Sequence, residues 1–197
     1  MADLEKTGKN LERRGFRVHR FASGAEAAEF LVQTLHGTSI GIGGSVTIDT
    51  LGVYDRLCGS NEVFWHWKNH APETRERAGK AETYLCSANG VSENGEIVNI
   101  DGFGNRLAAT LHGTGKVYMI VGKNKLAENL DAAIARIKNV SCPANAKRLG
   151  LKTPCAVLGH CTDCSSPQRM CRATLIFDRK PNAHPIDILL VDEELGF

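Results

Sequence analysis

Long hydrophobic runs are missing from this chain of 197 residues. No stretch approaches the roughly 20 apolar residues that a membrane-spanning helix needs. The first six residues are acidic and amphipathic with no apolar run, so we expect no secretory signal. From these absences we expect a cytoplasmic protein without a membrane partner.

An excess of charge of one sign is missing too. The chain has 24 Lys and Arg residues against 22 Asp and Glu residues, a formal net charge of +2, and the two signs are interspersed. A nucleic-acid-binding protein normally carries a basic stripe or patch that attracts the phosphate backbone. No long basic stripe is visible, so we expect no nucleic-acid partner.

Internal repeats and low-complexity segments are also absent. A chain of this length can bury most of its apolar surface in one core and needs no disulfides to do so. We therefore predict a single domain over residues 1–197.

Strand and helix patterns alternate along most of the chain. At the start of one predicted helix, Ser23 can act as the cap and Glu26 has capping-box spacing. Strands are predicted over 16–21, 38–42, 62–67, 83–87, 97–100, 116–121 and 186–191, and helices over 4–11, 24–35, 46–57, 72–79 and 126–137. This order predicts an α/β fold with a mostly parallel sheet, helices on both faces, and a ligand site beyond the carboxyl ends of the strands.

Seven cysteines stand out against these absences. In a reducing compartment they are better explained as metal ligands, nucleophiles or core residues than as disulfides. Cys155, Cys161, Cys164 and Cys171 include a Cys-x-x-Cys pair and lie within residues 141–172, which hold three prolines and show little periodicity. We predict a loop-rich lobe whose four thiolates bind one metal centre, either zinc or an iron-sulfur cluster.

The cysteine spacing leaves alternatives open. It does not separate zinc from iron-sulfur, and four incidental core cysteines would produce it as well. His160 or Asp163 could replace one ligand, and Cys142 is a spare candidate.

A glycine-rich segment over residues 41–47 follows a predicted strand and precedes a predicted helix. Glycines allow a backbone to approach an anion, and Ser45 and Thr47 add hydroxyl donors. The segment lacks the lysine of a Walker loop, and a tight turn that needs positive φ is the alternative explanation.

A polar segment over residues 87–106 lies at another strand end. Glu93 and Asp101 are candidates for acid, base or nucleophile, and Arg106 for an anion clamp. The alternative is a hairpin that turns at Asn94 and Gly95. The candidate ligand-binding residues of the two segments are Gly41, Gly43, Gly44, Ser45, Thr47, Asn89, Asn94, Asp101, Gly102, Gly104, Asn105 and Arg106.

Two weaker features complete the survey. Residues 123–125, Lys-Asn-Lys, follow a strand and could reach an anionic ligand, although lysines before a helix are usually only solvated. Trp65 and Trp67 share one face of a strand with His66 on the other, which is typical of a half-buried wall.

Several motifs together resemble the LUD (lactate utilisation) domain family, whose members include the LutC and YkgG proteins. They are residues 41–45 (GIGGS), 87–91 (SANGV), 96–102 (EIVNIDG) and 145–155 (NAKRLGLKTPC), and the similarity reaches the closing residues 190–197. The segment 161–171 is similar to the cysteine-bearing subgroup of that family.

The resemblance implies a fold of the ribose-5-phosphate isomerase, glucosamine-6-phosphate deaminase and coenzyme A transferase kind. It implies a role in organic-acid metabolism and electron transfer, linked to the oxidation of L-lactate to pyruvate, and it favours a [4Fe-4S] cluster over zinc. The partners that it implies are a small anionic ligand or organic acid and other lactate-utilisation iron-sulfur subunits. A homodimer is a further option.

Residues 92–95, Ser-Glu-Asn-Gly, look like a motif of class I coenzyme A transferases, whose Glu attacks an acyl thioester. Glu93 is therefore the candidate catalytic residue of an alternative, a coenzyme A transferase-like or sugar-phosphate enzyme. Another alternative is a non-catalytic accessory subunit with structural zinc. Whether the protein is an enzyme stays open at this point.

Overall fold

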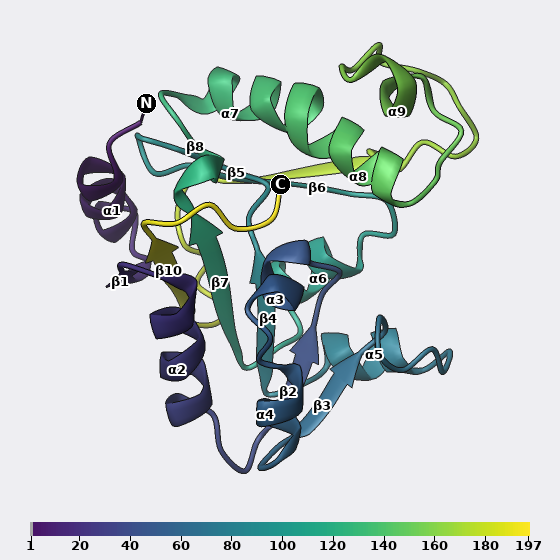
Figure 1. The fold of residues 1–197 in the computed structure, drawn as a ribbon. Helices are drawn as coiled ribbons and strands as arrows, with labels where there is room; N and C mark the ends of the chain where they lie inside the picture. The colour runs from purple at the N-terminus through teal and green to yellow at the C-terminus, as the bar shows by residue number, and fades with distance from the viewer. Residues whose placement is uncertain (1) are drawn as a thin grey trace.

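A sheet of six parallel strands forms the centre of the molecule in the computed structural model, which describes residues 2–197 (Figure 1). The strand order is β1 (Arg17–Phe21), β10 (Ile186–Val191), β7 (Lys116–Gly122), β4 (Thr83–Ser87), β2 (Ser39–Ile42) and β3 (Glu62–Trp65). Every pair of neighbours is parallel. The predicted α/β fold with a mostly parallel sheet is confirmed.

Three helices cover one face of this sheet: α2 (Gly24–Thr34), α3 (Val46–Thr50) and α4 (Tyr54–Cys58). The predicted cap is present, since Ser23 Oγ accepts a hydrogen bond from the amide of Glu26 at 3.3 Å. The prediction of one helix over 46–57 is wrong. Gly52 adopts φ of +63°, a left-handed conformation that breaks the helix between α3 and α4.

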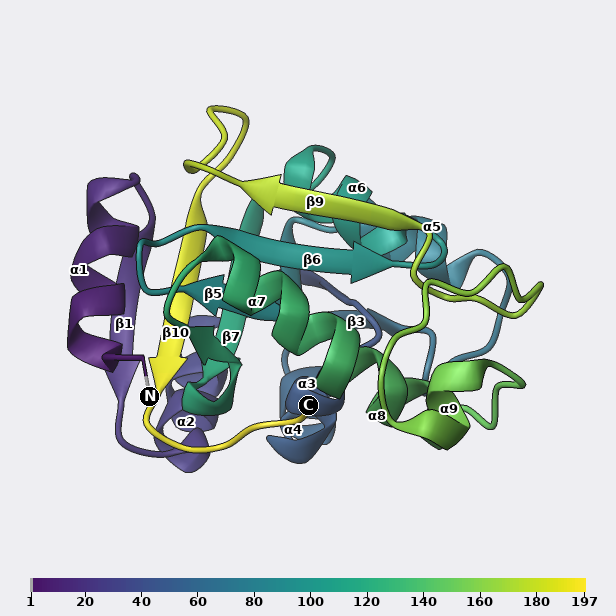
Figure 2. The same ribbon diagram turned by 90° about the horizontal axis from the view of Figure 1, so that it is seen from above.

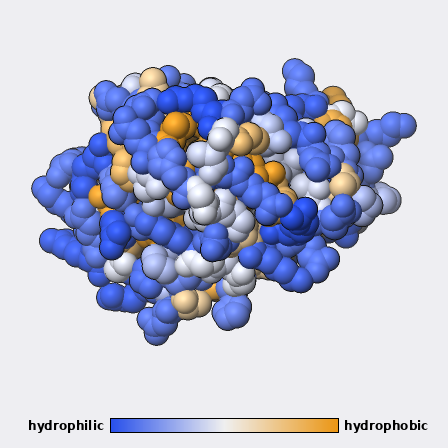
Figure 3. All heavy atoms as spheres, turned by 90° about the horizontal axis from the view of Figure 1, so that it is seen from below, coloured by the Kyte–Doolittle hydropathy of each residue, from blue (hydrophilic) through white to orange (hydrophobic). Residues whose placement is uncertain are grey.

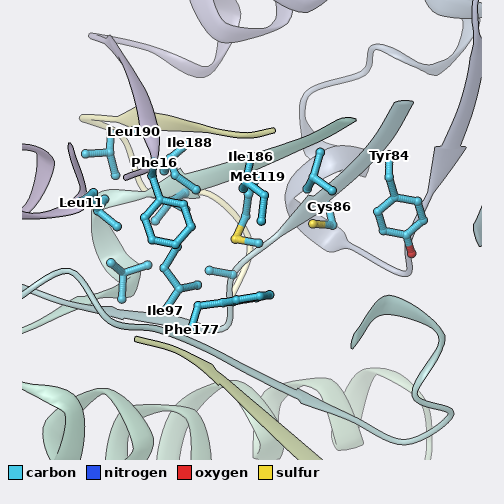
Figure 4. Close-up of a cluster of buried hydrophobic side chains, with 14 of the residues drawn as sticks. Leu11, Phe16, Tyr84, Cys86, Ile97, Met119, Phe177, Ile186, Ile188 and Leu190 are labelled. Atoms are coloured by element: carbon cyan, nitrogen blue, oxygen red, sulfur yellow. The ribbon is translucent and has the colours of Figure 1, made fainter. Parts of the chain in front are cut away.

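The other face packs against a second, four-stranded sheet of order β8 (Leu126–Ala127), β5 (Gly90–Ser92), β6 (Ile97–Asp101) and β9 (Ala173–Phe177). Helices α1 (Leu4–Arg13), α5 (Thr74–Gly79) and α6 (Asn105–Leu111) add to the same layer. Figure 4 shows the core between the two sheets, where Phe16, Met119 and Phe177 meet. The antiparallel pair β5 and β6 turns at Gly95, with φ of +92°, so the hairpin anticipated there is present.

A long helical stretch covers the outer face of the second sheet (Figure 2). It consists of α7 (Leu130–Arg136), a π-helical segment (Ile137–Ser141) and α8 (Cys142–Arg148). The predicted start of this helix at residue 126 is wrong, because Asn129 caps α7 by accepting from the amide of Ala132 at 2.9 Å. The stretch also continues into the segment that was predicted to be loop-rich, where the short α9 (Pro154–Leu158) follows.

The surface seen from below in Figure 3 is mainly hydrophilic, with hydrophobic residues in small patches. Among the described residues, no helix combines the length and the apolar character needed to cross a membrane.

Candidate functional site

A cavity of about 670 Å³ opens at the carboxyl ends of the central strands. Ser45 and Thr47 follow β2, Ser87 ends β4, and Lys125 closes a 3-10 turn after β7; all four side chains line this cavity. The ligand site was predicted at this edge of the sheet because parallel strands present their carboxyl ends together. The size is typical of a pocket for a small organic ligand.

The polar segment forms a second wall. Asp101 accepts hydrogen bonds from the amides of Gly102 at 2.8 Å and Arg106 at 3.1 Å, and so fixes the start of α6. The Arg106 guanidinium donates from Nη2 to Asn89 Oδ1 at 3.0 Å and to the carbonyl of Ile100 at 2.7 Å. Because its side chain is held by two acceptors, Arg106 presents a fixed positive charge to the cavity.

The cysteine lobe forms a third wall. Cys142, Asn145 and Arg148 line the cavity from α8, and residues 167–172, which include Cys171, line it from the end of the lobe. The glycine-rich segment, the polar segment and the lobe are distant in sequence, yet they enclose one space. The sequence left open whether the cysteines and the glycines meet. Of the predicted metal ligands, Cys171 lines the same cavity as Gly44, whereas Cys155, Cys161 and Cys164 lie outside its lining.

Positive charge predominates among the lining residues. The only acidic side chain among the described residues of the lining is that of Asp101. The lining cations are Arg75, Arg106, Lys125, Arg148, Arg169 and Arg172. Arg169 is paired with Asp163 at 2.8 Å, and within residues 2–197 the other five form no ion pair. Such a cavity attracts an anion, because the excess positive charge lacks a protein counter-ion.

Lys125 is the most deeply buried of these cations, with 3% of its surface exposed. Its Nζ donates to Thr47 Oγ1 at 2.6 Å and to Ser87 Oγ at 2.7 Å. Burial, followed by the nearby charges of Arg106 and Arg136, lowers the pKa of Lys125 to about 7. The amine can therefore gain or lose a proton at neutral pH.

An aromatic wall completes the site. The indoles of Trp65 and Trp67 stack with ring centroids 5.6 Å apart. They do not share a strand face, because β3 ends at Trp65 and the amides of Lys68 and Asn69 bond back to the Trp65 carbonyl, which places Trp67 in a turn. Trp67 and His66 line the cavity, and the Arg148 guanidinium lies 4.7 Å from the Trp67 ring centroid. Burial, followed by the charge of Arg75, lowers the pKa of His66, which keeps this imidazole neutral at neutral pH.

Most of the predicted ligand-binding residues come together. Those that line the cavity are Gly44, Ser45, Thr47, Asn89, Asp101, Gly102, Asn105 and Arg106. Those outside the lining are Gly41, Gly43, Asn94 and Gly104. Gly41 has a packing role, because a Cβ there would lie 2.0 Å from the carbonyl oxygen of Ala78 in α5. None of the three glycines at 41, 43 and 44 has positive φ, so the alternative of a left-handed turn does not explain them.

Glu93 lies away from the cavity lining, in the hairpin between β5 and β6. Its carboxylate accepts from the amide of Asp3 at 2.7 Å and from Lys6 Nζ at 2.5 Å, and these bonds, in that order, lower the pKa of Glu93. The side chain thus joins the hairpin to α1.

The cysteines of the lobe are partly exposed, and their thiols are not drawn around one centre. Within residues 2–197, no group of three or more His, Cys, Asp or Glu side chains is placed to hold a metal ion. Burial, followed by the thiols of Cys171, Cys155 and Cys161, raises the pKa of Cys142, the spare candidate ligand, to about 12. We assign no chemical step to a metal.

The sequence does not identify Lys125 as one of the candidate ligand-binding residues. The indication in the sequence that Lys125 could belong to the site was its position directly after a strand, but lysines at such positions are usually solvated. What buries Lys125 is its pairing with hydroxyls 78 and 38 residues earlier in the chain, and this pairing has no local signature.

Comparison with known proteins agrees with this architecture. None of the curated proteins matches the chain. The fold is similar to the crystal structure of a DUF162 family protein from Deinococcus radiodurans, with a TM-score of 0.55, 13% sequence identity and 95% of each chain covered. The sequence pattern of the LUD domain matches residues 4–191. The chain therefore belongs to the LUD domain family, which relates it to lactate utilisation.

Proposed function

We propose that the cavity binds a small organic acid as its anion and that the protein acts on this acid in lactate-related metabolism. The observation that carries the proposal is the charge of the lining, in which five cations without an ion pair among the described residues face one acidic side chain. Membership of the LUD domain family supports a hydroxy acid or oxo acid as the class of ligand.

The lining offers complementary partners for such an acid. The fixed guanidinium of Arg106 and the protonated form of Lys125 can each pair with a carboxylate. Thr47 and Ser87 place hydroxyl groups beside Lys125, where they can bond to the oxygen on the second carbon. The arrangement resembles other anion sites, in which a few polar groups orient a ligand inside a largely apolar pocket.

Calorimetric titration tests this proposal. Pyruvate, L-lactate and inorganic phosphate are titrated into the protein, with lactamide as a neutral analogue of lactate. We expect binding of at least one carboxylate, weaker binding as salt concentration rises, and no heat from lactamide. Binding of phosphate alone would favour a sugar-phosphate ligand, and equal affinity for lactate and lactamide would reject the proposal.

An iron-sulfur cluster in the cysteine lobe is a separate proposal. It is supported by the Cys-x-x-Cys spacing, by the partial exposure of all four predicted ligands and by the family resemblance. In this proposal Cys155, Cys161, Cys164 and Cys171 would hold the cluster, and the cluster would supply one-electron transfer.

Anaerobic purification followed by metal and sulfide analysis tests the cluster. We expect iron and sulfide in equal amounts, lost in Cys161→Ser and Cys164→Ser but retained in Cys58→Ser, which changes an exposed cysteine outside the lobe. Zinc without sulfide would contradict the iron-sulfur proposal and favour an accessory subunit with a structural metal.

A further inference from the structure

Lys125 has features that binding an anion does not require. It is buried, lines the cavity, and holds its Nζ between two hydroxyl groups with no carboxylate partner among the described residues. We propose that Lys125 is a nucleophile, whose amine forms an imine with the carbonyl carbon of a 2-oxo acid bound in the cavity. This inference rests on the proposed function and names the chemistry of that site.

The hydrogen bonds around Lys125 Nζ leave its lone pair free to attack a carbonyl carbon. Thr47 Oγ1 donates onward to the carbonyl of Leu195 at 3.2 Å, and Ser87 Oγ donates to the carbonyl of Ala88 at 3.1 Å. Both hydroxyls therefore act as acceptors towards Lys125. When the amine is neutral, its two N–H bonds satisfy these acceptors, and the lone pair takes the remaining direction around nitrogen.

The surroundings of Lys125 favour the neutral form of its amine. The charged and titratable groups that act on Lys125 are Arg106 and Arg136, whose positive charges disfavour a third cation, and Cys86, which is buried and un-ionised. With its pKa lowered to about 7, roughly half of Lys125 is neutral at pH 7. For an exposed lysine that fraction is about one in 2,500. A desolvated lysine beside other cations is a recurring way to activate an amine.

The same cations favour a 2-oxo acid as the carbonyl partner. A plain aldehyde or ketone would leave the positive charges around Lys125 unpaired, whereas the carboxylate of a 2-oxo acid can pair with Arg106 while its carbonyl lies one bond away. Because the carboxylate is bonded directly to the carbonyl carbon, binding of the carboxylate also orients the reacting carbon towards the amine.

The step balances without an added oxidant or reductant. Nζ bonds to the carbonyl carbon, the carbonyl oxygen gains a proton and the nitrogen loses one, which gives a carbinolamine. The carbon–oxygen bond then breaks, the nitrogen gives up its remaining proton so that the hydroxyl leaves as water, and the nitrogen completes a double bond to carbon. Thr47 and Ser87 lie where they can pass the protons.

Reductive trapping tests the inference on the intact, unmodified protein. Pyruvate and sodium cyanoborohydride are added at pH 7, and the modified lysines are located by peptide mass mapping. Lys123, in the same turn, is the internal control, because it is exposed and paired with Asp192 at 3.0 Å. We expect at least about tenfold more product on Lys125 than on Lys123, because the neutral amine is the reactive form.

Variants and a competitor sharpen the test. Lys125→Arg should abolish the dominant adduct, whereas Lys123→Arg should leave it unchanged. L-lactate, which has no carbonyl, should form no adduct but should slow trapping by pyruvate. Equal labelling of all lysines would overturn the inference. If pyruvate binds calorimetrically but leaves Lys125 unmodified, the imine is rejected and the anion site remains; if nothing binds, the proposed function fails as well.

Discussion

At the scale of single residues, the lowered pKa of Lys125 links stability to pH. In the unfolded chain an ordinary lysine stays protonated to about pH 10.4, whereas in the folded protein Lys125 loses its proton above about pH 7. Between these values the unfolded chain binds more protons, so the free energy of unfolding rises with pH by at most about 1.4 kcal/mol per pH unit from this group.

Lys125→Met removes this contribution. At pH 7 we expect the variant to be more stable than the original protein by about 1–2 kcal/mol, because a buried amine no longer has to be desolvated. The difference in the free energy of unfolding between Lys125→Met and the original protein should become smaller as pH rises towards 10. Urea unfolding of both proteins between pH 7 and pH 9.5 measures the difference, and parallel pH profiles would show that the pKa of Lys125 is not lowered.

Prediction of site residues from sequence succeeded for residues that lie close together in one segment, because the motif that identifies them also brings them into contact. Asp101, Gly102 and Arg106 are close in sequence and meet at the start of α6, so their joint place in the cavity follows from local turn geometry. It failed for Lys125, whose partners Thr47 and Ser87 come from two other strand ends. Burial of a charge depends on such distant contacts.

At the scale of elements, the hairpin between β5 and β6 separates Glu93 from the cavity and ties it to α1. Asn10 of the same helix donates from Nδ2 to the carbonyl of Glu93 at 2.7 Å. Glu93 therefore has a full set of partners that keep it on the α1 side, and this placement differs from that of a carboxylate attacking a ligand in the cavity.

Glu93→Gln distinguishes these roles. We expect pyruvate affinity to stay within about twofold of the original value, because Glu93 lies outside the lining of the cavity that is proposed to bind the acid. Amide hydrogen exchange in α1 should become faster, since the ion pair with Lys6 and part of the bond to the amide of Asp3 are lost. A loss of acyl transfer or of any hydroxy-acid activity, with α1 exchange unchanged, would instead support the catalytic alternative.

The prediction of helices and strands from sequence was limited by contacts between residues that are far apart in the chain. The helix over 46–57 was overextended because Gly52 is the only break in an otherwise favourable pattern. The strand β9 was missed because its outer residues are exposed and it pairs with β6, about 75 residues earlier in the chain. The second sheet as a separate layer could not be predicted for the same reason.

At the scale of the whole molecule, the fold brings three sequence motifs to one cavity. The strand order of the central sheet sets the ends of β2, β4 and β7 side by side, and the second sheet carries the polar segment and the cysteine lobe across them. Sequence alone predicted the edge of the sheet at which the cavity opens, because the carboxyl ends of parallel strands share that edge. It could not predict that the lobe closes the same space, because this depends on the helical stretch that ends in α8.

The most direct test of the account is a paired calorimetric titration of pyruvate into Lys125→Gln and Lys123→Gln. Both variants remove one positive charge from the same turn, but only Lys125 lines the cavity. We predict a loss of affinity of about tenfold or more for Lys125→Gln and less than about twofold for Lys123→Gln. Equal affinities for the two variants would contradict the claim that this cavity is the organic-acid site.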